Sequence, residues 1–481
     1  MLKRVRVESV AEELSRADLG DKRRTARLRE IAQVLETEPA KSFPRAMGSD
    51  AALEAFYRFI NNVGFGAADI VAPHIAATAK RAKAAGTVIA VHDTTMMEYG
   101  ATRLDLGTTT GGKHFGFVAH AVLLMAEQDG LPLGIAHLET FNRSGKKWQK
   151  RRKHGQRTRV HSHDKNRESL RWLRGLHAVE RARPGRFEAI HVTDAEGDFF
   201  ELLASVHTQR ARFVIRAGQL DRLVMNGRHM CSVREVADKI APRTSWKVQL
   251  TERKHPPGSN RSVKRRYPAR SARTAKVAVG AARITIGKTR YSDVEATPLE
   301  ISVVRVWEPK PPEGESAVEW VLFTTEDTSS AGALRRIVEI YRKRWVIEDY
   351  FKALKSGCSL EKRQVESYNA LTKVLALFAP IAYRLLLLRG WERTNSRAAA
   401  IRVFSRIDLH LMACAPANHG RPAPKTIADA MALLARLGGH IRNNGKPGWQ
   451  TLAWGYEKLL LMKLGWVAAT SGKFQQKCDQ S

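Results

Sequence analysis

The stretch Tyr341-Arg-Lys-Arg-Trp-Val-Ile-Glu348-Asp-Tyr-Phe-Lys-Ala-Leu-Lys355 is the most informative segment of the 481-residue chain. If it forms one α-helix, at about 100° per residue, Tyr341, Arg344, Glu348 and Lys355 fall within an arc of roughly 60°. Such a stripe runs about 21 Å along the axis, which suits a phosphate backbone better than a small-molecule pocket. It predicts phosphodiester chemistry on a polynucleotide. A surface ladder of ion pairs through Arg344, Glu348 and Lys352 is the competing interpretation.

The charge of the chain points to a polyanionic partner. Lysine and arginine number 81 against 48 aspartates and glutamates, so the net charge is +33 at pH 7. An excess that large repels itself unless a polyanion neutralises it, and nucleic acid is the partner we expect. The basic residues are spread along the chain, which argues against a membrane-binding amphipathic helix. The most basic tract, residues 146–165, is expected to be a loop that follows phosphates or a solvated segment.

Cysteine usage and apolar runs exclude several other classes. The four cysteines are far apart and form no metal or disulfide pattern, so we expect a reducing cytosol. The N-terminus lacks the apolar region of a secretory signal. The longest apolar run, Val374 to Tyr383, contains Pro380 and stops at Arg384, short of the roughly 20 residues that a membrane span needs. No membrane partner is expected.

Three domains are expected from the length and the pattern of the chain. Residues 1–66 form a helical unit, in which Arg23 and Arg27 share the outward face of one helix and Arg58 lies on a second. These arginines would dock on DNA or form a solvated surface. Residues 366–481 have the apolar spacing of a helical domain, and the helix from Met431 to Leu437 ends at Gly438 and Gly439.

Residues 67–365 are expected to form an α/β core. Apolar runs predict strands at Thr87–His92, Phe115–Met125, Leu131–Leu138, Phe187–Thr193 and Arg212–Arg216. Hairpins followed by strand and helix alternation indicate a mixed sheet covered by helices. Residues 225–315 interrupt this rhythm and predict a β-rich insertion before the strand Val318–Thr324. Ser329 or Ser330 is expected to cap the helix that carries Tyr341.

Three carboxylates are candidates for catalysis. Asp93 and Asp194 each follow an expected strand, where ligands bind in α/β sheets, although each would also suit a helix cap or a turn. Glu348 on the helix adds a third. Three carboxylates are the ligands required by two Mg²⁺ ions about 3.5–4 Å apart at a scissile phosphate, where one ion activates water or a 3′-hydroxyl.

The spacing Tyr341-x2-Arg344-x3-Glu348-x6-Lys355 resembles the Y-R-E-K signature of the IS-four family of insertion-sequence transposases. Other segments resemble the family as well: Leu19–Leu28 and Tyr57–Ile60 its end-recognition domain, Asp93–Thr95 and Asp194–Asp198 the surroundings of its two catalytic aspartates, and Ala435–Gly439 its dimerisation region. The resemblance implies an α/β, RNase H-like mixed-sheet core with a β-rich insertion, flanked by helical N- and C-terminal domains.

The resemblance also implies roles for individual residues. Asp93, Asp194 and Glu348 would be the catalytic metal ligands for two Mg²⁺ ions, for which Mn²⁺ substitutes. Tyr341, Arg344 and Lys355 would position DNA phosphates, and Trp320 would stack on a flipped base, although a tryptophan in a strand is more often core. Arg23, Arg24, Arg27 and Arg58 would contact DNA without an assigned base.

The function implied by the resemblance is cut-and-paste transposition. A homodimer in a synaptic complex would bind double-stranded DNA at the element's ends, nick it, form and open a hairpin, and join the ends to target DNA. It would act in the bacterial cytoplasm, at the nucleoid. The alternative is a DNA-binding regulator derived from a transposase that no longer cleaves, against which the intact carboxylates argue. A structural RNA-binding protein is a further rival, suggested by charge alone.

Overall fold

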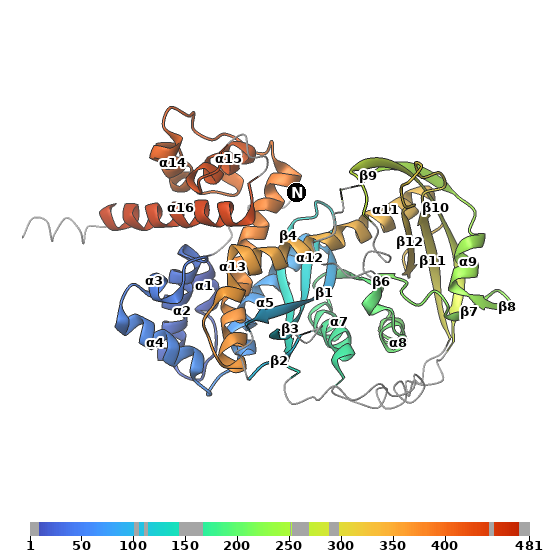
Figure 1. Ribbon diagram of the computed structural model, residues 1–481, viewed down its shortest axis with the longest axis horizontal. Helices are drawn as coiled ribbons and strands as arrows, with labels where there is room; N and C mark the ends of the chain where they lie inside the picture. Colours follow the sequence, from blue (N-terminus) through green and yellow to red (C-terminus); the bar gives the residue numbers. More distant parts are fainter. Residues whose placement is uncertain are drawn as a thin grey trace, which may run out of the picture. The chain divides into compact units, whose positions relative to one another are not determined.

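The computed structural model describes residues 9–100, 105–109, 114–143, 167–250, 252, 269–287, 298–441 and 447–470. The basic tract 146–165 lies outside these residues. The chain divides into two compact units. Unit 1 contains residues 1–149, 181–188 and 345–481, and unit 2 contains residues 150–180 and 189–344. The two units are coloured along the chain in Figure 1 and are described separately below.

Unit 1 begins with helices whose ends are set by capping side chains. They are α1 (Val10–Leu14), α2 (Lys22–Thr37), α3 (Phe43–Met47), α4 (Asp50–Asn61) and α5 (Ala67–Ala85). Ser9, Asp21 and Ser49 each accept a hydrogen bond from a backbone N–H in the first turn of the helix that follows. Leu28, Ile31 and Leu35 are buried. The two N-terminal helices expected from the sequence are thereby confirmed as α2 and α4.

An antiparallel sheet follows in unit 1. It contains β1 (Thr87–Tyr99), β2 (Gly107–Thr108), β3 (Phe115–Ala126) and β4 (Pro132–Phe141), with β3 paired to the other three. The prediction that the first strand ends at His92 is wrong. The strand continues to Tyr99 because β3 is long enough to pair with all of it, and Asp93 therefore lies within β1, opposite Ala121.

The C-terminal part of unit 1 is helical, as expected. It consists of α13 (Tyr368–Asn395), α14 (Arg406–Cys414), α15 (Ile427–Leu437) and α16 (Trp449–Thr470), with short turns η6 (Ala400–Arg402) and η7 (Pro416–Asn418). Helices α5 and α13 pack against β4 (Figure 1). A Cβ on Gly438 would lie 1.9 Å from the Thr451 carbonyl oxygen, so glycine permits the close approach of α15 and α16.

Helix α13 passes through Pro380 and Arg384, where the sequence had suggested the end of an apolar run. Its segment Tyr368–Thr394 is long and apolar enough to cross a membrane by composition alone. The most apolar window of this segment is entirely buried inside the structure, as in the core helix of a soluble protein. Burial against the surrounding protein thus accounts for its hydropathy.

Unit 2 is built on a mixed sheet. Strands β5 (Glu188–Thr193) and β6 (Arg212–Arg216) are parallel, and β12 (Glu319–Thr324) is antiparallel to β6. Antiparallel pairing continues from β12 through β11 (Leu299–Trp307) and β10 (Arg273–Ile286) to the outer strands β7 (Leu223–Asn226), β8 (His229–Ser232) and β9 (Thr244–Leu250). The expected mixed sheet is confirmed, and the insertion strands extend it.

Helices pack on the sheet of unit 2. The turn η1 (Glu168–Leu170) precedes α7 (Arg171–Ala182), and α8 (Phe200–Thr208) and α9 (Val233–Lys239) join α7 in one apolar core with β6, β10, β11 and β12. Phe213, Val303 and Phe323 are buried in that core. Helix α11 (Ala331–Arg342) contacts β6 and β10, and Ser330 caps it as expected. Residues such as Trp172 and Leu176 thus hold the sheet that carries Asp194.

The segment that carries the signature is not one regular α-helix, so that prediction is wrong. Helix α11 ends at Arg342 and is followed by the 3₁₀ turn η3 (Lys343–Trp345), α12 (Val346–Lys352), the π-turn η4 (Ala353–Gly357) and the 3₁₀ turn η5 (Leu360–Lys362). A 3₁₀ turn advances about 120° per residue, so an angle computed for a uniform helix does not hold. Each piece turns to bury its own apolar residues, such as Ile337 in α11 and Tyr350 in α12.

Candidate active site

Asp194 lies directly after the buried strand β5, as the sequence predicted. It is the N-cap of the turn η2 (Ala195–Gly197), and its Oδ1 accepts a hydrogen bond from the Glu196 backbone N–H at 2.9 Å. The capping interpretation of Asp194 is therefore correct, and within the described part of the chain no residue forms a hydrogen bond to the second oxygen, Oδ2. A Cβ on Gly197 would lie 2.2 Å from the Thr193 hydroxyl, so only glycine allows this tight turn.

A buried ion pair fixes the loop that follows Asp194. The Asp198 side chain is fully buried and pairs with Arg222 at 2.6 Å. Its Oδ2 also accepts hydrogen bonds from the Gly218 and Gln219 backbone N–H groups, both at 2.8 Å. These bonds join the turn after β5 to the loop after β6. Asp198 therefore positions Asp194 through the backbone.

Aromatic and basic side chains of unit 2 gather near Asp194. The rings of Trp320 and Tyr341 are 6.0 Å apart between centroids, and Trp320 is only partly buried. Burial raises the pKa of Tyr341, the positive charges of Arg216 and Arg344 lower it, and the negative charge of Asp194 raises it further. Asp194, Arg344 and Tyr341 thus interact electrostatically within one unit. Arg216, at the end of β6, was missed from the sequence, where it looked like an ordinary strand end.

The charge of Asp194 affects the pKa of a second carboxylate close to it, Glu196. Partial desolvation and then the negative charge of Asp194 raise the pKa of Glu196 above its usual value. Because 63% of the Glu196 side chain is exposed, the negative charge of Asp194 contributes more to the raised pKa of Glu196 than desolvation does. Arg171 forms an ion pair with Glu196 at 3.0 Å and offsets part of this repulsion. A cation at Asp194 would relieve the same repulsion.

The other two predicted ligands belong to unit 1. Asp93 lies in β1, and its Oδ1 accepts a hydrogen bond from the Thr94 backbone N–H at 2.7 Å. Helix α12, which carries Glu348, packs against β1. The π-turn η4 places Lys355 on the same strand, where its Nζ donates to the Met96 carbonyl oxygen and forms an ion pair with Glu361 at 3.0 Å. One strand of unit 1 is therefore in contact with elements that carry both Glu348 and Lys355.

The surface ion-pair ladder proposed as an alternative for this segment fails at Arg344. That side chain is only 7% exposed, so it does not belong to a solvated surface. Lys352, the third member of the ladder, lies 3.8 Å from Asp349 instead. An ordinary surface ladder therefore does not explain the signature residues.

Three of the four N-terminal arginines are exposed. The side chains of Arg23, Arg58 and Arg27 are 93%, 74% and 47% exposed, and each pairs with a carboxylate at most four residues away. Exposed pairs of this kind are weak and exchange readily for a phosphate. Arg24 differs, because it is partly buried and its Nη1 donates to the Leu19 carbonyl oxygen at 3.1 Å.

A metal site can be assessed by the chemistry of its donors. Carboxylate oxygens are ligands that Mg²⁺ prefers, so Asp93, Asp194 and Glu348 suit that ion. Among the described residues, no group of three or more His, Cys, Asp or Glu side chains is gathered closely enough to hold a metal ion. The reason to consider Asp93, Asp194 and Glu348 as metal ligands is therefore that their carboxylate oxygens suit Mg²⁺.

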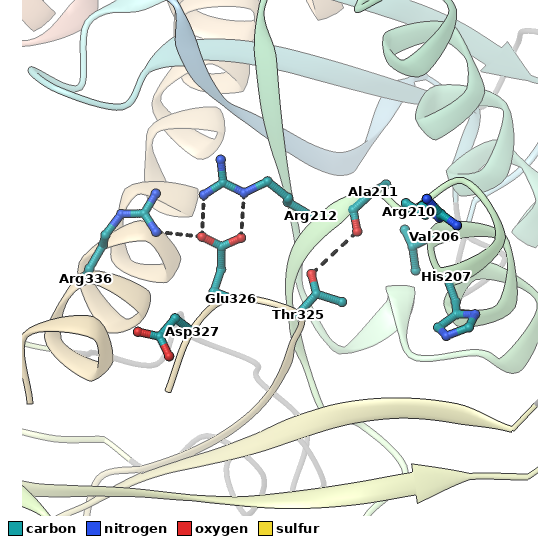
Figure 2. A pocket seen from close by; sticks show the side chains of 9 residues that line it. All are labelled: Val206, His207, Arg210, Ala211, Arg212, Thr325, Glu326, Asp327 and Arg336. Atoms are coloured by element: carbon teal, nitrogen blue, oxygen red, sulfur yellow. Dashed lines mark hydrogen bonds and ion pairs between the residues drawn. The ribbon is translucent and has the colours of Figure 1, made fainter. Parts of the chain in front are cut away.

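A charged pocket of about 540 Å³ lies in unit 2 at the amino end of β6, at the sheet edge opposite to Asp194. Figure 2 shows Arg212 and Arg336 directed at Glu326. Arg212 binds it with both Nε and Nη2, at 2.8 and 2.6 Å, and Arg336 binds at 2.6 Å. Burial opposes the effect, but these two arginines lower the pKa of Glu326. This network joins β6 to α11 and was not foreseen from the sequence.

Comparison with protein families bears on these residues. Residues 8–64 match the family model of a transposase DNA-binding domain, and residues 146–382 match that of a transposase DDE domain. The second match includes Trp320, Tyr341, Arg344, Lys355 and the carboxylates Asp194 and Glu348, whereas Asp93 precedes it. The four N-terminal arginines lie inside the first match.

The chain is therefore a DNA-binding protein with a domain of the class that cleaves DNA. The DNA-binding and DDE domains together make it a transposase, and DNA is its partner. A DDE domain implies an RNase H-like core, and domains of this class use divalent metal ions. The mixed sheet of unit 2 accords with such a core, and helices α1–α5 and α13–α16 accord with helical regions on either side of it.

Proposed function

We propose that this transposase moves its element by cut-and-paste transposition, as an IS-four type enzyme that resembles the transposase of transposon five. The observation that carries the proposal is the grouping of Asp194, Trp320, Tyr341 and Arg344 within unit 2, inside the DDE match. A carboxylate beside an aromatic ring and a guanidinium is suited to a DNA phosphate and an unstacked base. The steps are nicking, hairpin formation, hairpin opening and strand transfer.

Asp93, Asp194 and Glu348 are assigned as the ligands of two Mg²⁺ ions, with Mn²⁺ as a substitute. When bound, the ions would supply an activated water or 3′-hydroxyl and stabilise the leaving oxygen. Support comes from the carboxylate donors themselves, from the position of Asp194 at a strand end, and from the packing of the Glu348 helix on the strand of Asp93.

The remaining residues of the proposed site handle the DNA. Lys355, whose side chain is 29% exposed, binds a phosphate, and the partly exposed Trp320 stacks on a flipped base. Tyr341 and Arg344 are 3% and 7% exposed, so only a small part of each residue is accessible to a phosphate. Arg23, Arg27 and Arg58 contact the element's ends from the N-terminal domain, and Arg24 braces the loop that follows Leu19.

The active form is assigned as a homodimer that holds two DNA ends in a synaptic complex at the bacterial nucleoid. Residues 1–66 bind the ends, residues 67–365 form the catalytic core, and residues 366–481 dimerise. Trp454 and Leu461, two turns apart on α16, are 41% and 40% exposed. Large apolar side chains repeated along one exposed helix face are suited to pairing with a second copy.

The test is a matched pair of substitutions in the purified protein. Glu348→Gln removes one proposed ligand charge at constant shape, and we expect it to abolish Mg²⁺-dependent cleavage of end DNA while end binding persists. Glu339→Gln makes the same change at a side chain that is 44% exposed and pairs with Arg342, and it should leave cleavage intact. The readouts are gel-resolved nicks and hairpins together with a mobility shift.

Retained cleavage by Glu348→Gln would exclude Glu348 as a ligand. If the unmodified protein shifts its end DNA but cleaves nothing with Mg²⁺ or Mn²⁺, the chain is a regulator derived from a transposase. Preference for RNA over end DNA in competition would contradict the proposal altogether.

A further inference from the structure

The pocket of about 540 Å³ in unit 2 lies apart from the residues assigned to DNA cleavage (Figure 2). Strand β6 separates the two places, because Arg212 begins the strand at the pocket and Arg216 ends it at the edge of the sheet where Asp194 lies. The four residue steps of this strand span about 13 Å at about 3.3 Å per residue. The pocket is therefore not part of the cleavage site, and its own side chains must indicate what it binds.

The pocket exposes two positively charged groups and keeps the acid that holds them inside. The Glu326 side chain is 3% exposed, whereas those of Arg212 and Arg336, which bind it, are 34% and 40% exposed. One buried carboxylate thus holds two partly exposed guanidinium groups in place. Arginines held in this way are prepared for an anion, because less side-chain freedom is lost when a further hydrogen bond forms.

A third arginine, Arg210, lines the pocket from an unusual backbone position. It follows α8 with a φ of +49°. The helix ends with hydrogen bonds from the Arg210 N–H to the His207 carbonyl oxygen at 3.0 Å and from the Ala211 N–H to the Val206 carbonyl oxygen at 2.8 Å. Glycine is the usual residue at this point of a helix end, because a side chain is disfavoured at positive φ.

The charge of Arg210 is not explained by the fold. Its side chain is exposed, and it forms no ion pair with any residue that the structure describes. A cation therefore stands where local structure favours glycine, and no acid in the described part of the chain accounts for it.

Cations lie on both sides of the pocket. Figure 2 shows Arg210 on one side and Arg212 and Arg336 on the other. An extended polyanion, whose charges repeat along its length, suits this arrangement better than a single small anion does.

The pocket stays positively charged after its acids are counted. Three arginines line it against the two acids Glu326 and Asp327. Both carboxylate oxygens of Asp327 accept hydrogen bonds from Ser329, at 2.9 Å each. Arg243 adds a fourth guanidinium beside Asp327, since it donates to the carbonyl oxygen of the next residue, Thr328, at 3.1 Å. The pocket therefore favours an anionic partner.

We propose that this pocket binds the phosphate backbone of double-stranded DNA, as a contact separate from the N-terminal arginines and from the cleavage site. DNA is the partner of this chain, so the proposal does not depend on the cleavage steps proposed above. Contacts between arginine and phosphate read no base sequence. The pocket therefore adds affinity for duplex DNA of any sequence.

The test measures binding of the full chain to a duplex that lacks the element's ends, by fluorescence anisotropy at several salt concentrations and without Mg²⁺. Loss of one phosphate contact should lower the slope of log K against log salt by about 0.9. Arg210→Asn should lower the slope by this amount and still fold, because it removes the charge and asparagine tolerates the left-handed backbone. Arg210→Lys keeps the charge and should keep the slope.

Arg228→Asn is the matched control. Arg228 is an exposed arginine of the same unit, in the turn between β7 and β8. Its loss removes the same charge from the chain but should leave the slope unchanged. An equal lowering by Arg228→Asn and Arg210→Asn would overturn the proposal, because the effect would then follow the total charge alone.

Hydrogen exchange locates the contact. With the same duplex, peptides that contain Arg210 and Arg212 and peptides from residues 325–336 should exchange more slowly, whereas inorganic phosphate at equal ionic strength should leave them unchanged. The proposal is overturned if Arg210→Asn keeps the slope of the unmodified protein, or if inorganic phosphate protects these peptides and the duplex does not. The second result would assign the pocket to a small phosphate-bearing molecule. None of these outcomes depends on DNA cleavage.

Discussion

Asp198 shows how one buried residue can govern a site that it does not enter. Its carboxylate is fully buried, pairs with Arg222 and accepts two backbone hydrogen bonds from the loop after β6. Replacing it with alanine leaves the Arg222 charge buried without its partner. We expect Asp198→Ala to lower the free energy of unfolding of unit 2 by about 3–5 kcal/mol, as for other broken buried pairs. Denaturant unfolding monitored by hydrogen exchange in β5 and β6 peptides would measure this.

The matched control is Asp238→Ala, which removes an aspartate that is 53% exposed and pairs with Arg234 at the surface. Its effect should stay below about 1 kcal/mol. The double variant Asp198→Leu with Arg222→Met should recover much of the lost stability, because both charges are then absent. Equal destabilisation by Asp198→Ala and Asp238→Ala would contradict the assigned role of Asp198.

The place of a single residue in the structure could be predicted from the sequence where neighbouring residues in the chain determine it. Asp194 was placed correctly because the apolar run of β5 and the glycine at residue 197 lie beside it. Asp198 and Arg216 received no role, because their partners Arg222 and Tyr341 come from elements elsewhere in the sequence. Spacing within a segment carries no information about such contacts.

At the scale of elements, the irregular helical segment that carries the signature contains a residue, Lys355, whose effects on stability and on DNA cleavage can be measured separately. Lys355 lies on the π-turn, pairs with Glu361 at 3.0 Å and donates to the Met96 carbonyl oxygen. Because the pair is partly exposed, we expect Lys355→Gln to change stability by less than about 1 kcal/mol. We expect it to slow cleavage of end DNA by about tenfold or more, since it removes a proposed phosphate contact. Melting temperature and the rate of nicking would distinguish the two effects.

Lys352→Gln is the matched control for this prediction. Lys352 is the last residue of α12, its side chain is 61% exposed, and its Nζ lies 3.8 Å from Asp349 on the same helix. It should affect neither quantity strongly. Equal slowing of cleavage by Lys352→Gln and Lys355→Gln would contradict a specific phosphate contact of Lys355, because any positive charge in this segment would then have the same effect.

Elements were predicted better by type than by extent. The strands β3, β5, β6 and β12 and the cap at Ser330 follow from local patterns, and the structure has them. The end of β1 was misplaced because pairing with β3, and not the apolar run, sets its length. The signature segment was predicted to be one regular helix, but the burial of residues such as Ile347 and Tyr350 against the rest of the protein favours the 3₁₀ and π turns instead.

At the scale of the whole molecule, contacts between distant segments hold unit 1 together. Arg363 donates to the Lys41 and Pro39 carbonyl oxygens and lies over the rings of Phe43 and Phe378. Lys373, fully buried on α13, donates to the carbonyl oxygens of Ile60 and Asn62. The sequence boundaries at residues 66 and 366 stay predictions, and no periodicity could have revealed that these segments pack in one unit.

A buried network in unit 1 links α1, α5 and β4. His74 donates from Nδ1 to Glu13 at 2.8 Å and accepts the Ile135 backbone N–H at Nε2 at 3.1 Å, so its ring is neutral. Burial lowers the pKa of His74 below its usual value of 6.5. Burial alone would raise the pKa of Glu13, but His74 and Arg81 outweigh it and lower that pKa to about 2.

These two shifts predict the acid sensitivity of unit 1. A histidine held neutral in the fold costs stability once the unfolded chain binds a proton, so the loss begins as the pH falls below 6.5. In the unfolded chain Glu13 binds a proton as the pH falls below 4.5, whereas in the fold its carboxylate stays charged down to about 2, so its contribution to stability is lost between these two values. Between pH 6.5 and 4.5 the loss therefore belongs to His74, at up to about 1.4 kcal/mol per pH unit.

His74→Gln isolates this contribution, because the glutamine amide can donate to Glu13 and accept from Ile135 without titrating. Hydrogen exchange of peptides from α1 and α5, corrected for intrinsic rates, should show protection that falls from pH 7 to pH 5 in the unmodified protein and stays nearly constant in the variant. His207→Gln, in α8 of unit 2, should retain the full dependence in these peptides. An unchanged pH slope in His74→Gln would mean that other groups carry the acid response, and that the neutral ring of His74 does not hold the N-terminal helices to the sheet.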